Sequence, residues 1–332
     1  MNNSMASSFS FGNLEDSQRE ILSNEMIPRV ENVCFLTGAT ASGKSQLGIE
    51  WAEKWNAEII SMDSMAIYRK MDIGTAKPTL EERKNIPHHL IDILDPCEEF
   101  SLADYLRLAR IKVEEIRSRN KIPLFVGGTP LYLKGLLRGV FLGPAADSEL
   151  RHELQEQEAA HGVGFLHNQL QKCDPVSALR LHPNDQRRII RALEVYEKTG
   201  QPISTFQKQF DIPASPESVR VWVLDWDRNE LYQRINNRVD LMMSVGFLEE
   251  VRSLLKERKP LSKTASQAVG YRELIDYIEN RRTLEDAVDQ IKLTSRHFAK
   301  RQGTWFRSMQ ECQFISVDSE KLAQLSNSMS LT

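Results

Sequence analysis

One stretch near the N-terminus limits what this chain of 332 residues can fold into. Residues 38–45 read Gly-Ala-Thr-Ala-Ser-Gly-Lys-Ser and fit the pattern G-x-x-x-x-G-K-[ST]. An apolar run at 33–36 precedes them, and apolar residues with helical spacing follow over 47–55. A strand, a glycine-containing turn and a helix in this order form a phosphate-binding loop, because backbone N–H groups at the helix start point inward with partial positive charge. The sequence therefore predicts a site for a diphosphate or a triphosphate.

The residues of this loop have separate expected roles. Backbone N–H groups hold phosphate oxygens, Lys44 reaches the outer ones, and the Ser45 hydroxyl ligates the Mg²⁺ that bridges them. The expected cofactor is therefore Mg²⁺. An ordinary glycine turn is the alternative, and the flanking strand and helix patterns argue against it. The residues expected at the diphosphate or nucleotide site are Gly38, Ala39, Thr40, Ala41, Ser42, Gly43, Lys44 and Ser45.

Two further predicted strands end in residues that suit the same site. Residues 58–62 form a short strand that ends at Asp63, and residues 122–126 form a strand that is followed by Gly127-Gly128-Thr129. Because the carboxyl ends of parallel strands meet at one edge of a sheet, Asp63 should face the same crevice as Lys44. A tight turn explains Gly-Gly-Thr equally well, so this junction is only a candidate second wall of the phosphate site.

The remaining pattern indicates an α/β protein. Residues 88–94 and 219–224 have strand patterns, and strand and helix patterns alternate through the N-terminal half. Most of the C-terminal part is helical. The predicted fold is a P-loop NTPase-like parallel sheet flanked by helices, with a helical insertion domain and a helical C-terminal region. The C-terminal helices are expected at 228–245, 247–257, 271–279 and 284–301.

Changes in composition divide the chain. Residues 1–31 are rich in Ser and Asn and are expected to be a disordered N-terminal extension, with at most a short helix over 17–23. Residues 32–145 and 216–310 should form the P-loop catalytic core, and residues 146–215 a helical insertion. Residues 311–332 are interpreted as a C-terminal tail.

Charge and cysteine content exclude several classes of protein. The net charge of −3 argues against a uniformly basic nucleic-acid binder, so any such surface must be local. The four cysteines are far apart, which disfavours a disulfide framework or a zinc site and fits a reducing compartment. No apolar run approaches the ~18 residues of a membrane span, and no targeting peptide is evident. We expect a cytoplasmic protein without a membrane partner and treat it as a monomer, although the sequence does not decide the oligomeric state.

The predicted last helix carries a basic stripe. Lys292, Arg296 and Lys300 recur every four residues with Arg301 alongside, and no acidic residue occurs from 291 to 310. Like charges at this spacing destabilise an isolated helix by a few tenths of a kcal/mol per pair. The stripe is either a solvated face or a surface that meets a polyanion. In the second case the insertion could contribute Arg187, Arg188 and Arg191 to the same nucleic-acid backbone.

Several segments together resemble one family, the tRNA dimethylallyltransferases, in the family's order. They are GATASGKS (38–45), DSMAIYRKMDIGTAKPT (63–79), PHHLIDILDP (87–96), VGGTPLYLKGLLRG (126–139), HPNDQRRIIRALEVY (182–196), VGYREL (269–274) and RHFAKRQGTWFR (296–307). Ala39 stands where many members have Pro, and Ser45 where many have Thr; both keep the chemistry. The resemblance implies transfer of a dimethylallyl group from dimethylallyl diphosphate to N6 of the adenosine 3′ to the anticodon, A37, in tRNA.

The resemblance also implies roles for single residues. Asp63 matches the family's general base, although a role as an outer partner of Mg²⁺ is an alternative. Thr129 matches a residue that contacts the reacting centre, and Lys44 and Arg238 match residues that contact the pyrophosphate. Reaching N6 requires the base to leave its stack. The set expected to contact tRNA at its anticodon stem-loop is Asp63, Ser64, Met65, Ala66, Thr129, Arg151, Arg187, Arg188, Ile189, Ile190, Arg191, Gly270, Tyr271, Arg272, Lys300 and Arg301.

Other functions remain open from the residues alone. A P-loop small-molecule kinase and an adenylate prenyltransferase would both use the same phosphate loop, but neither requires a basic helix or an insertion. A nucleic-acid-binding ATPase is a third alternative, for which Asp92 and Asp95 are only weak candidates as a second acidic motif. The sequence does not decide whether ATP binds, which tRNAs are modified or what residues 1–31 do.

Overall fold

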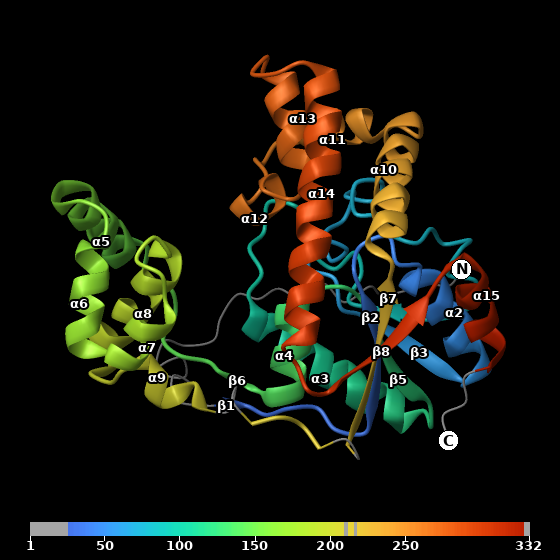
Figure 1. Cartoon of the computed structure of the whole chain (residues 1–332), viewed down its shortest axis with the longest axis horizontal. Coiled ribbons are helices and arrows are strands. Elements are labelled where there is room, and N and C mark those ends of the chain that lie inside the picture. The colour runs from blue at the N-terminus through green and yellow to red at the C-terminus, as the bar shows by residue number, and fades with distance from the viewer. Residues whose placement is uncertain (1–25, 209–211, 216–217, 329–332) are drawn as a thin grey trace, which may run out of the picture. The chain divides into compact units, whose positions relative to one another are not determined.

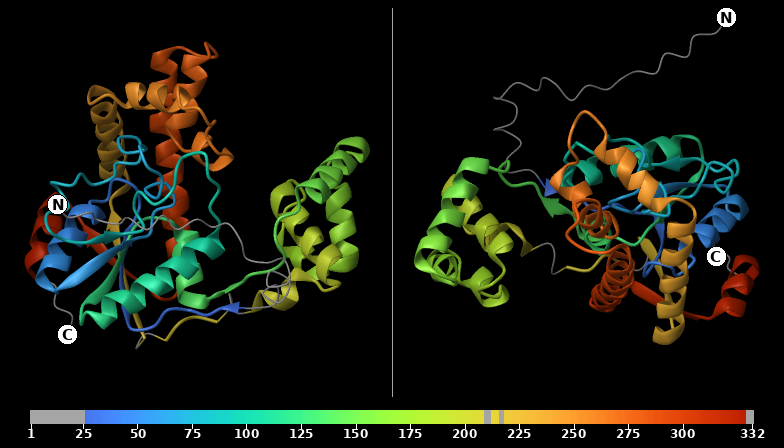
Figure 2. Two further views of the ribbon diagram at one scale, coloured as in Figure 1. Left: turned by 180° about the vertical axis from the view of Figure 1, so that it is seen from behind. Right: turned by 90° about the horizontal axis from the view of Figure 1, so that it is seen from above.

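The computed structural model describes residues 26–208, 212–215 and 218–328. They form two compact units, and Figures 1 and 2 show the elements of each. Residues 28–139 and 212–328 form the core unit, and residues 26–27 and 140–208 form the insertion unit. The helix expected over 17–23 and most of the expected N-terminal extension lie outside the described residues.

The core unit is built on a six-stranded parallel sheet. The strand with the phosphate loop at its end lies inside the sheet, between the strand before Gly127-Gly128-Thr129 and the strand that returns after the insertion. This arrangement brings the predicted loops to one edge of the sheet. In spatial order the strands are β4 (His88–His89), β3 (Ala57–Ser61), β5 (Ile122–Val126), β2 (Val33–Gly38), β7 (Val219–Trp226) and β8 (Cys312–Val317).

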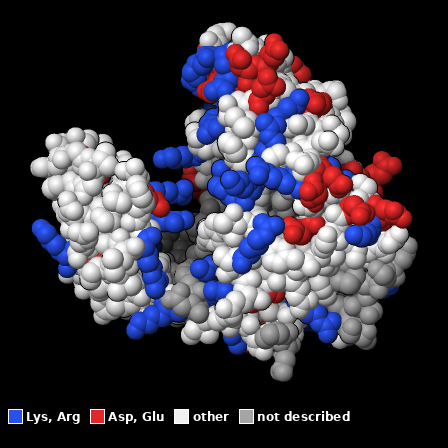
Figure 3. All heavy atoms as spheres, viewed as in Figure 1, with Lys and Arg blue, Asp and Glu red and all other residues white. Residues whose placement is uncertain are grey.

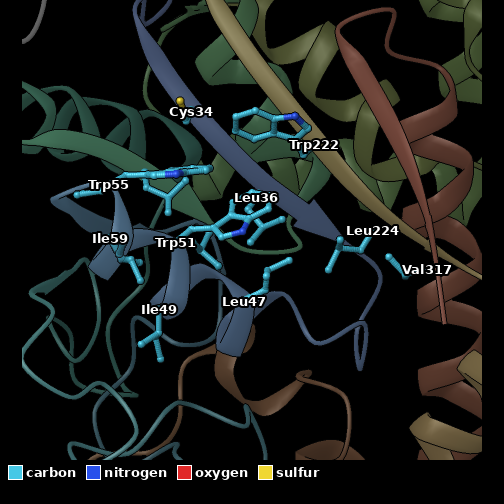
Figure 4. Packing of buried hydrophobic residues seen from close by; sticks show 14 of the residues in the cluster. Cys34, Leu36, Leu47, Ile49, Trp51, Trp55, Ile59, Trp222, Leu224 and Val317 are labelled. Atoms are coloured by element: carbon cyan, nitrogen blue, oxygen red, sulfur yellow. The ribbon is translucent and has the colours of Figure 1, made fainter. Parts of the chain in front are cut away.

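Helices cover both faces of this sheet. In Figure 1, α2 (Lys44–Lys54) and α15 (Ser319–Ser328) lie on one side, and α3 (Leu102–Ser118) and α4 (Pro130–Arg138) lie on the other. All residues of β2 and β3 are buried, as expected for strands that are covered on both faces. On the α2 side the rings of Trp51, Trp55 and Trp222 pack together, with centroids 4.7–5.7 Å apart (Figure 4). This packing fixes α2 against the sheet.

The C-terminal helices form a second core beyond the carboxyl ends of the strands. Side chains from these helices bury Tyr68 and Met71, which belong to the long loop after β3. The loop therefore becomes part of a packed wall. Within the described ranges, none of the helices combines the length and the apolar character needed to cross a membrane. The helices are α10 (Arg228–Ser244), α11 (Phe247–Leu255), α12 (Lys263–Ser266), α13 (Tyr271–Ile278) and α14 (Leu284–Arg307).

The insertion unit has a hydrophobic core of its own. Leu154, Leu166, Leu170 and Val195 are almost fully buried in it. Aspartates cap its longer helices: Asp147 accepts from the backbone N–H groups of two residues in the first turn that follows it. Its elements are β1 (Met26–Ile27), β6 (Val140–Phe141), α5 (Ser148–His161), α6 (Phe165–Cys173), α7 (Pro175–Arg180), α8 (Gln186–Thr199) and α9 (Ile203–Phe206).

Both predicted ends of the core were placed wrongly. Residues 311–332 were expected to be a tail, but β8 pairs with β7 over six residues and extends the sheet. The half-exposed pattern of this edge strand, with Phe314 and Gln313 at the surface, obscures it in the sequence. Residues 26–31 were assigned to a disordered extension, but Met26 and Ile27 pair with Phe141 and Val140.

Two internal boundaries also differ from the prediction. The strand expected over 88–94 is only His88–His89. Leu90 and Asp92 have φ of 60° and 56°, a left-handed conformation that cannot continue a strand. Residues 140–145 belong to the insertion unit although they were assigned to the core, and residues 212–215 belong to the core unit although they were assigned to the insertion.

A buried ion pair holds the start of β8 against α4. Arg138 donates from Nε and Nη2 to the two carboxylate oxygens of Glu311, each at 2.9 Å, and the side chains are 8% and 1% exposed. The backbone N–H of Ala214 donates to the same carboxylate at 3.1 Å. Burial alone would raise the pKa of Glu311, but these hydrogen bonds outweigh burial and hold the pKa below its ordinary value of 4.5.

Replacing Glu311 by Ala should lower the free energy of unfolding at neutral pH by about 3–5 kcal/mol, because it leaves Arg138 buried without its carboxylate. Since the folded pKa of Glu311 is depressed, its contribution is present above the unfolded pKa and is lost as the pH falls through the folded value. Urea denaturation of both proteins at neutral and acidic pH measures this. The difference should shrink on acidification, and Glu320→Ala, at an exposed glutamate, should have little effect. Equal urea midpoints for wild type and Glu311→Ala would contradict the assignment.

Candidate active site

A cavity of about 330 Å³ opens in the core unit where β2, β3 and β5 end. The edge of the sheet supplies mainly polar groups to it, while the C-terminal helices supply apolar side chains that include Val239, Met242 and Phe247. The cavity thus has a charged floor and an apolar wall, which suits a ligand with a polar and an apolar end. Its polar residues include Thr40, Lys44, Ser45, Asp63, Ser64, Thr129, Arg238 and Gln302.

The phosphate loop and the Gly-Gly-Thr turn meet at this cavity. Thr37 Oγ1 donates to the carbonyl of Gly127 at 2.7 Å. A Cβ atom on Gly128 would lie 2.6 Å from Gln302 Nε2 and 3.3 Å from Lys44 Nζ, so a larger residue would displace both side chains. The structure therefore places Gly127-Gly128-Thr129 beside the phosphate loop, which makes it a wall of the same cavity.

Gln302 joins these two loops, and sequence reasoning missed it. Its Oε1 accepts from the backbone N–H of Thr40 at 2.9 Å, and its Nε2 donates to the carbonyl of Gly128 at 2.6 Å. The residue is 3% exposed although it lies on the strongly charged helix α14. The only sign of Gln302 in the sequence was its place in the segment RQGTWFR, which belongs to the family resemblance. The neighbouring basic residues predicted a nucleic-acid contact and gave no indication of a buried amide.

Asp63 is fixed so that one of its oxygens faces the cavity. Its Oδ1 accepts from the backbone N–H groups of Met65 at 2.8 Å and Ala66 at 3.3 Å. Both hydrogen bonds go to Oδ1, which leaves Oδ2 available to a ligand. Thr129 Oγ1 accepts from the backbone N–H of Ser64 at 3.0 Å and so lies against the same turn. The predicted pair Asp63 and Thr129 is therefore brought together.

Two cations face Asp63 across the cavity. Removal from water and the nearby positive charge of Arg238 lower the pKa of Lys44 to about 8, although Asp63 opposes the shift. Burial lowers the pKa of Arg238 as well, again against the effect of Asp63. Arg238 Nη1 donates to Thr40 Oγ1 at 3.4 Å, which places the guanidinium beside the phosphate loop. Two partly desolvated cations and one carboxylate suit a polyanionic ligand.

The donors available for Mg²⁺ fit a phosphate-assisted site. Ser45 lines the cavity from the first turn of α2, and its hydroxyl makes no hydrogen bond to any other described residue. In the described part of the chain, no cluster of three His, Cys, Asp or Glu could hold a metal ion by itself. Mg²⁺ commonly takes one or two protein oxygens and completes its shell with phosphate oxygens and water. Ser45 with a bound diphosphate fits that pattern.

The residues predicted to contact tRNA divide by location. Asp63, Ser64, Met65, Ala66 and Thr129 line the cavity. Gly270 and Tyr271 are buried, and the Tyr271 hydroxyl donates to Glu250 at 2.6 Å. Both residues pack against Phe247, which keeps Gly270 from the protein surface. Tyr271 also lines the cavity, so it stays a predicted contact for a base that enters there. Arg272 is exposed and pairs with Glu273 at 2.7 Å.

In the insertion unit, two of the residues predicted to contact tRNA have buried side chains. Ile189 and Ile190 are 1% and 4% exposed in its core, so their side chains cannot contact tRNA. Two of its predicted arginines share one acid: Arg151 and Arg191 both donate to the fully buried carboxylate of Glu194. Arg187 and Arg188 are exposed; Arg188 pairs with Asp185 at 3.5 Å, and Arg187 makes no ion pair within the described residues.

Half of the basic stripe is also paired within the protein. Lys292 Nζ lies 2.6 Å from a carboxylate oxygen of Asp240, and Arg296 donates to Asn236 at 2.7 Å. Both partners are on α10, so these two cations hold α14 to its neighbour. Lys300 and Arg301 are exposed and make no ion pair in the described parts of the chain. Figure 3 shows lysine and arginine side chains gathered on the face of the core unit that carries α14 in Figure 1.

Comparison with known proteins gives one consistent match. Residues 66–309 match the family model described as IPP transferase. A tRNA dimethylallyltransferase from Rhodopirellula baltica is 46% identical over 297 residues, which cover 87% of this chain and 89% of the relative. The enzyme of that name from Pelotomaculum thermopropionicum is 44% identical over 299 residues, covering 89% and 95% of the two chains.

Solved structures agree with the sequence matches. The crystal structure of the full-length tRNA isopentenylpyrophosphate transferase from Bacillus halodurans is 41% identical, has a TM-score of 0.65 and covers 90% of this chain and 95% of that one. A eukaryotic dimethylallyltransferase crystallised while acting on tRNA is 30% identical with a TM-score of 0.74, covering 90% of this chain and 77% of that one. Both support the parallel-sheet P-loop fold predicted from the sequence.

Diphosphate binding should depend on the charge of Lys44. Because that charge is lost as the pH rises through about 8, the affinity for inorganic pyrophosphate should fall above this pH, at up to about tenfold per pH unit. Calorimetric titration across the pH range, with Mg²⁺ present, measures the profile. Lys44→Ala should bind weakly throughout, and Lys44→Arg, which keeps its charge, should show only the ligand's own titration. Parallel profiles for wild type and Lys44→Arg would refute the role of this ammonium.

Proposed function

The chain belongs to the IPP transferase family, and we propose that it transfers a dimethylallyl group from dimethylallyl diphosphate to N6 of A37 in its tRNA substrate. The observation that carries the proposal is one shared cavity. The phosphate loop with Lys44 and Arg238 opens into it, and so do Asp63 and Thr129. A diphosphate leaving group and an acceptor amine can therefore meet in one enclosed space, with an apolar wall for the dimethylallyl group between the helices.

The leaving group is stabilised at the floor of the cavity. When the allylic C–O bond breaks, negative charge grows on the departing pyrophosphate. Lys44, Arg238 and the N–H groups of the loop are placed to hold that charge, in surroundings where electrostatic interactions are stronger than in water. Mg²⁺, held by Ser45 and phosphate oxygens, would supply further neutralisation of the phosphate charge.

The acceptor requires a base, because the lone pair of adenine N6 is delocalised into the ring. As N6 forms a bond to the allylic carbon and the C–O bond breaks, the amine loses a proton, and Asp63 Oδ2 is free to accept it. Thr129 lies beside this carboxylate turn and would contact the reacting centre. A cavity of about 330 Å³ admits a base but no stacked helix, so the adenosine must flip out to enter it.

Contacts with the tRNA backbone are assigned to those predicted cations that are exposed. In the core unit these are Arg272, Lys300 and Arg301, and in the insertion unit they are Arg187 and Arg188. We propose further that the enzyme acts as a monomer in the cytoplasm, since a tRNA substrate is met there and the cavity is complete within one chain.

The reaction is tested by offering labelled dimethylallyl diphosphate with three acceptors in parallel: unmodified tRNA, AMP and ATP. Label should enter tRNA alone, at the adenosine 3′ to the anticodon. Asp63→Asn keeps the shape of the side chain but cannot accept the proton, so turnover should fall by roughly 10²–10⁴ with little change in either Kd.

Label in AMP would favour the adenylate prenyltransferase, and phosphoryl transfer from ATP without prenylation would favour the kinase. If Asp63→Asn weakened only Mg²⁺ or diphosphate affinity, Asp63 would be an outer partner of the metal instead of a base.

The proposed contact of α14 with tRNA is tested by measuring tRNA affinity in variants of this helix. Replacing Lys300 and Arg301 by Ala should weaken tRNA binding and flatten its salt dependence by about one unit of slope per lost phosphate contact. The control is Lys292→Ala with Arg296→Ala on the same helix, where both side chains already have partners on α10. Filter binding across a salt series measures both. The assignment to Lys300 and Arg301 fails if their loss leaves the slope unchanged.

A further inference from the structure

We propose that Trp226, Arg234 and Leu322 form a brace behind the phosphate loop and that this brace sets the affinity of the loop for a diphosphate. The inference rests on the proposed function, because it concerns the same diphosphate site. The three residues come from the end of β7, from α10 and from α15, and none of them lines the 330 Å³ cavity. Trp226 and Leu322 are therefore positioning residues, which act on the ligand through the loop.

The need for a brace follows from the geometry of the loop. When successive N–H groups point inward to hold an anion, the carbonyl oxygens between them point outward. Outward carbonyls that are buried need donors of their own, since an unpaired buried carbonyl costs about as much as a lost hydrogen bond. Donors behind the loop therefore stabilise the conformation in which the N–H groups face the ligand.

Trp226 and Arg234 supply two such donors. The indole N–H of Trp226 donates to the carbonyl of Ser42 at 2.9 Å, and this hydrogen bond is buried. Arg234 Nε donates to the carbonyl of Ala41 at 2.9 Å. The Arg234 guanidinium lies over the Trp226 ring, 4.1 Å from its centroid, so the two donors also hold each other in place. One tryptophan thus fixes one carbonyl directly and the neighbouring one through the arginine.

Leu322 is the third residue of the brace and packs against Gly43 of the phosphate loop. Gly43 has φ of +88°, and a Cβ atom on it would lie 2.6 Å from Leu322 Cδ2 and 3.6 Å from Arg234 Nη2. Helix α15, which carries Leu322, packs on α2, where Trp51 Nε1 donates to the carbonyl of Leu325 at 3.4 Å. The segment that resembled a tail in the sequence therefore presses directly on the last turn of the phosphate loop.

The brace should act on binding more than on turnover. Arg234 also lines a second cavity of about 450 Å³, which shares Ala41, Lys44, Ser45 and Arg238 with the first, so its charge can contribute to anion binding by itself. Trp226 and Leu322 line neither cavity and affect the ligand only through the conformation of the loop. These two residues consequently give the clean test.

The test compares two substitutions of the same kind. Trp226→Phe removes the donor to Ser42 and keeps a ring beneath Arg234. Trp55→Phe is the matched control: Trp55 is equally buried, at 8% exposure, and its indole N–H has no hydrogen-bond partner in the described structure. By calorimetry, Trp226→Phe should raise the Kd for dimethylallyl diphosphate about fivefold, the effect of one lost hydrogen bond, while Trp55→Phe leaves it unchanged.

Turnover at saturating diphosphate and the Kd for tRNA should change by less than about twofold in Trp226→Phe. Equal diphosphate Kd values for the two tryptophan variants would overturn the brace. So would a Trp226→Phe variant that loses tRNA and diphosphate affinity together with thermal stability, since that is general damage to the fold.

A second pair of variants tests the part of the brace that α15 contributes. Leu322→Ala should weaken diphosphate binding, and Gln324→Ala, at an exposed position of the same helix, should not. Inorganic pyrophosphate is titrated alongside for all variants. If wild type binds pyrophosphate but not dimethylallyl diphosphate, the proposed function fails, and the brace is then judged by the pyrophosphate Kd alone. Unchanged pyrophosphate binding in both Trp226→Phe and Leu322→Ala would overturn the brace in that case.

Discussion

The side-chain amide of Gln302 holds the two loops of the site together. One end accepts from the N–H of Thr40 in the phosphate loop, and the other donates to the carbonyl of Gly128. An amide is suited to this position because it offers both a donor and an acceptor, whereas a carboxylate or an ammonium offers only one kind of group. Since Gln302 is on α14, the helix must reach the edge of the sheet, and the C-terminal helices then form a wall of the cavity instead of a separate layer.

The charges inside the cavity explain why such a rigid frame is needed. Lys44 and Arg238 repel each other in partly desolvated surroundings, and Asp63 offsets only part of that repulsion. A diphosphate bound here, as proposed, would offset the positive charge of both cations. The two cations stay in place to do so because Arg238 contacts Thr40 and Lys44 contacts the Ala39 carbonyl.

The features that the sequence predicted well are local ones. The phosphate loop, its strand and its helix are neighbours in the chain, and so are the strand at 122–126 and the turn after it. Gln302 could not be found in this way, because its two partners come from distant parts of the chain. The edge strand β8 has no clear alternation of apolar residues and depends on pairing with β7. Ile189 and Ile190 lie in a basic segment, and only the packed core of the insertion unit shows that they face inward.

The pairing of the basic stripe on α14 could not be predicted from the sequence either, because the partners lie on another helix. The absence of acidic residues along a helix does not leave its cations unpaired, because Asp240 and Asn236 on α10 reach Lys292 and Arg296 from outside. What remains exposed is the pair Lys300 and Arg301, immediately before Gln302 in the chain. A polyanion bound at these two residues would therefore act on the same turn of α14 that holds the phosphate loop and the Gly128 turn. The helix that is proposed to contact the nucleic acid is then also the helix that holds the two loops of the cavity together, so α14 would position both proposed substrates relative to each other.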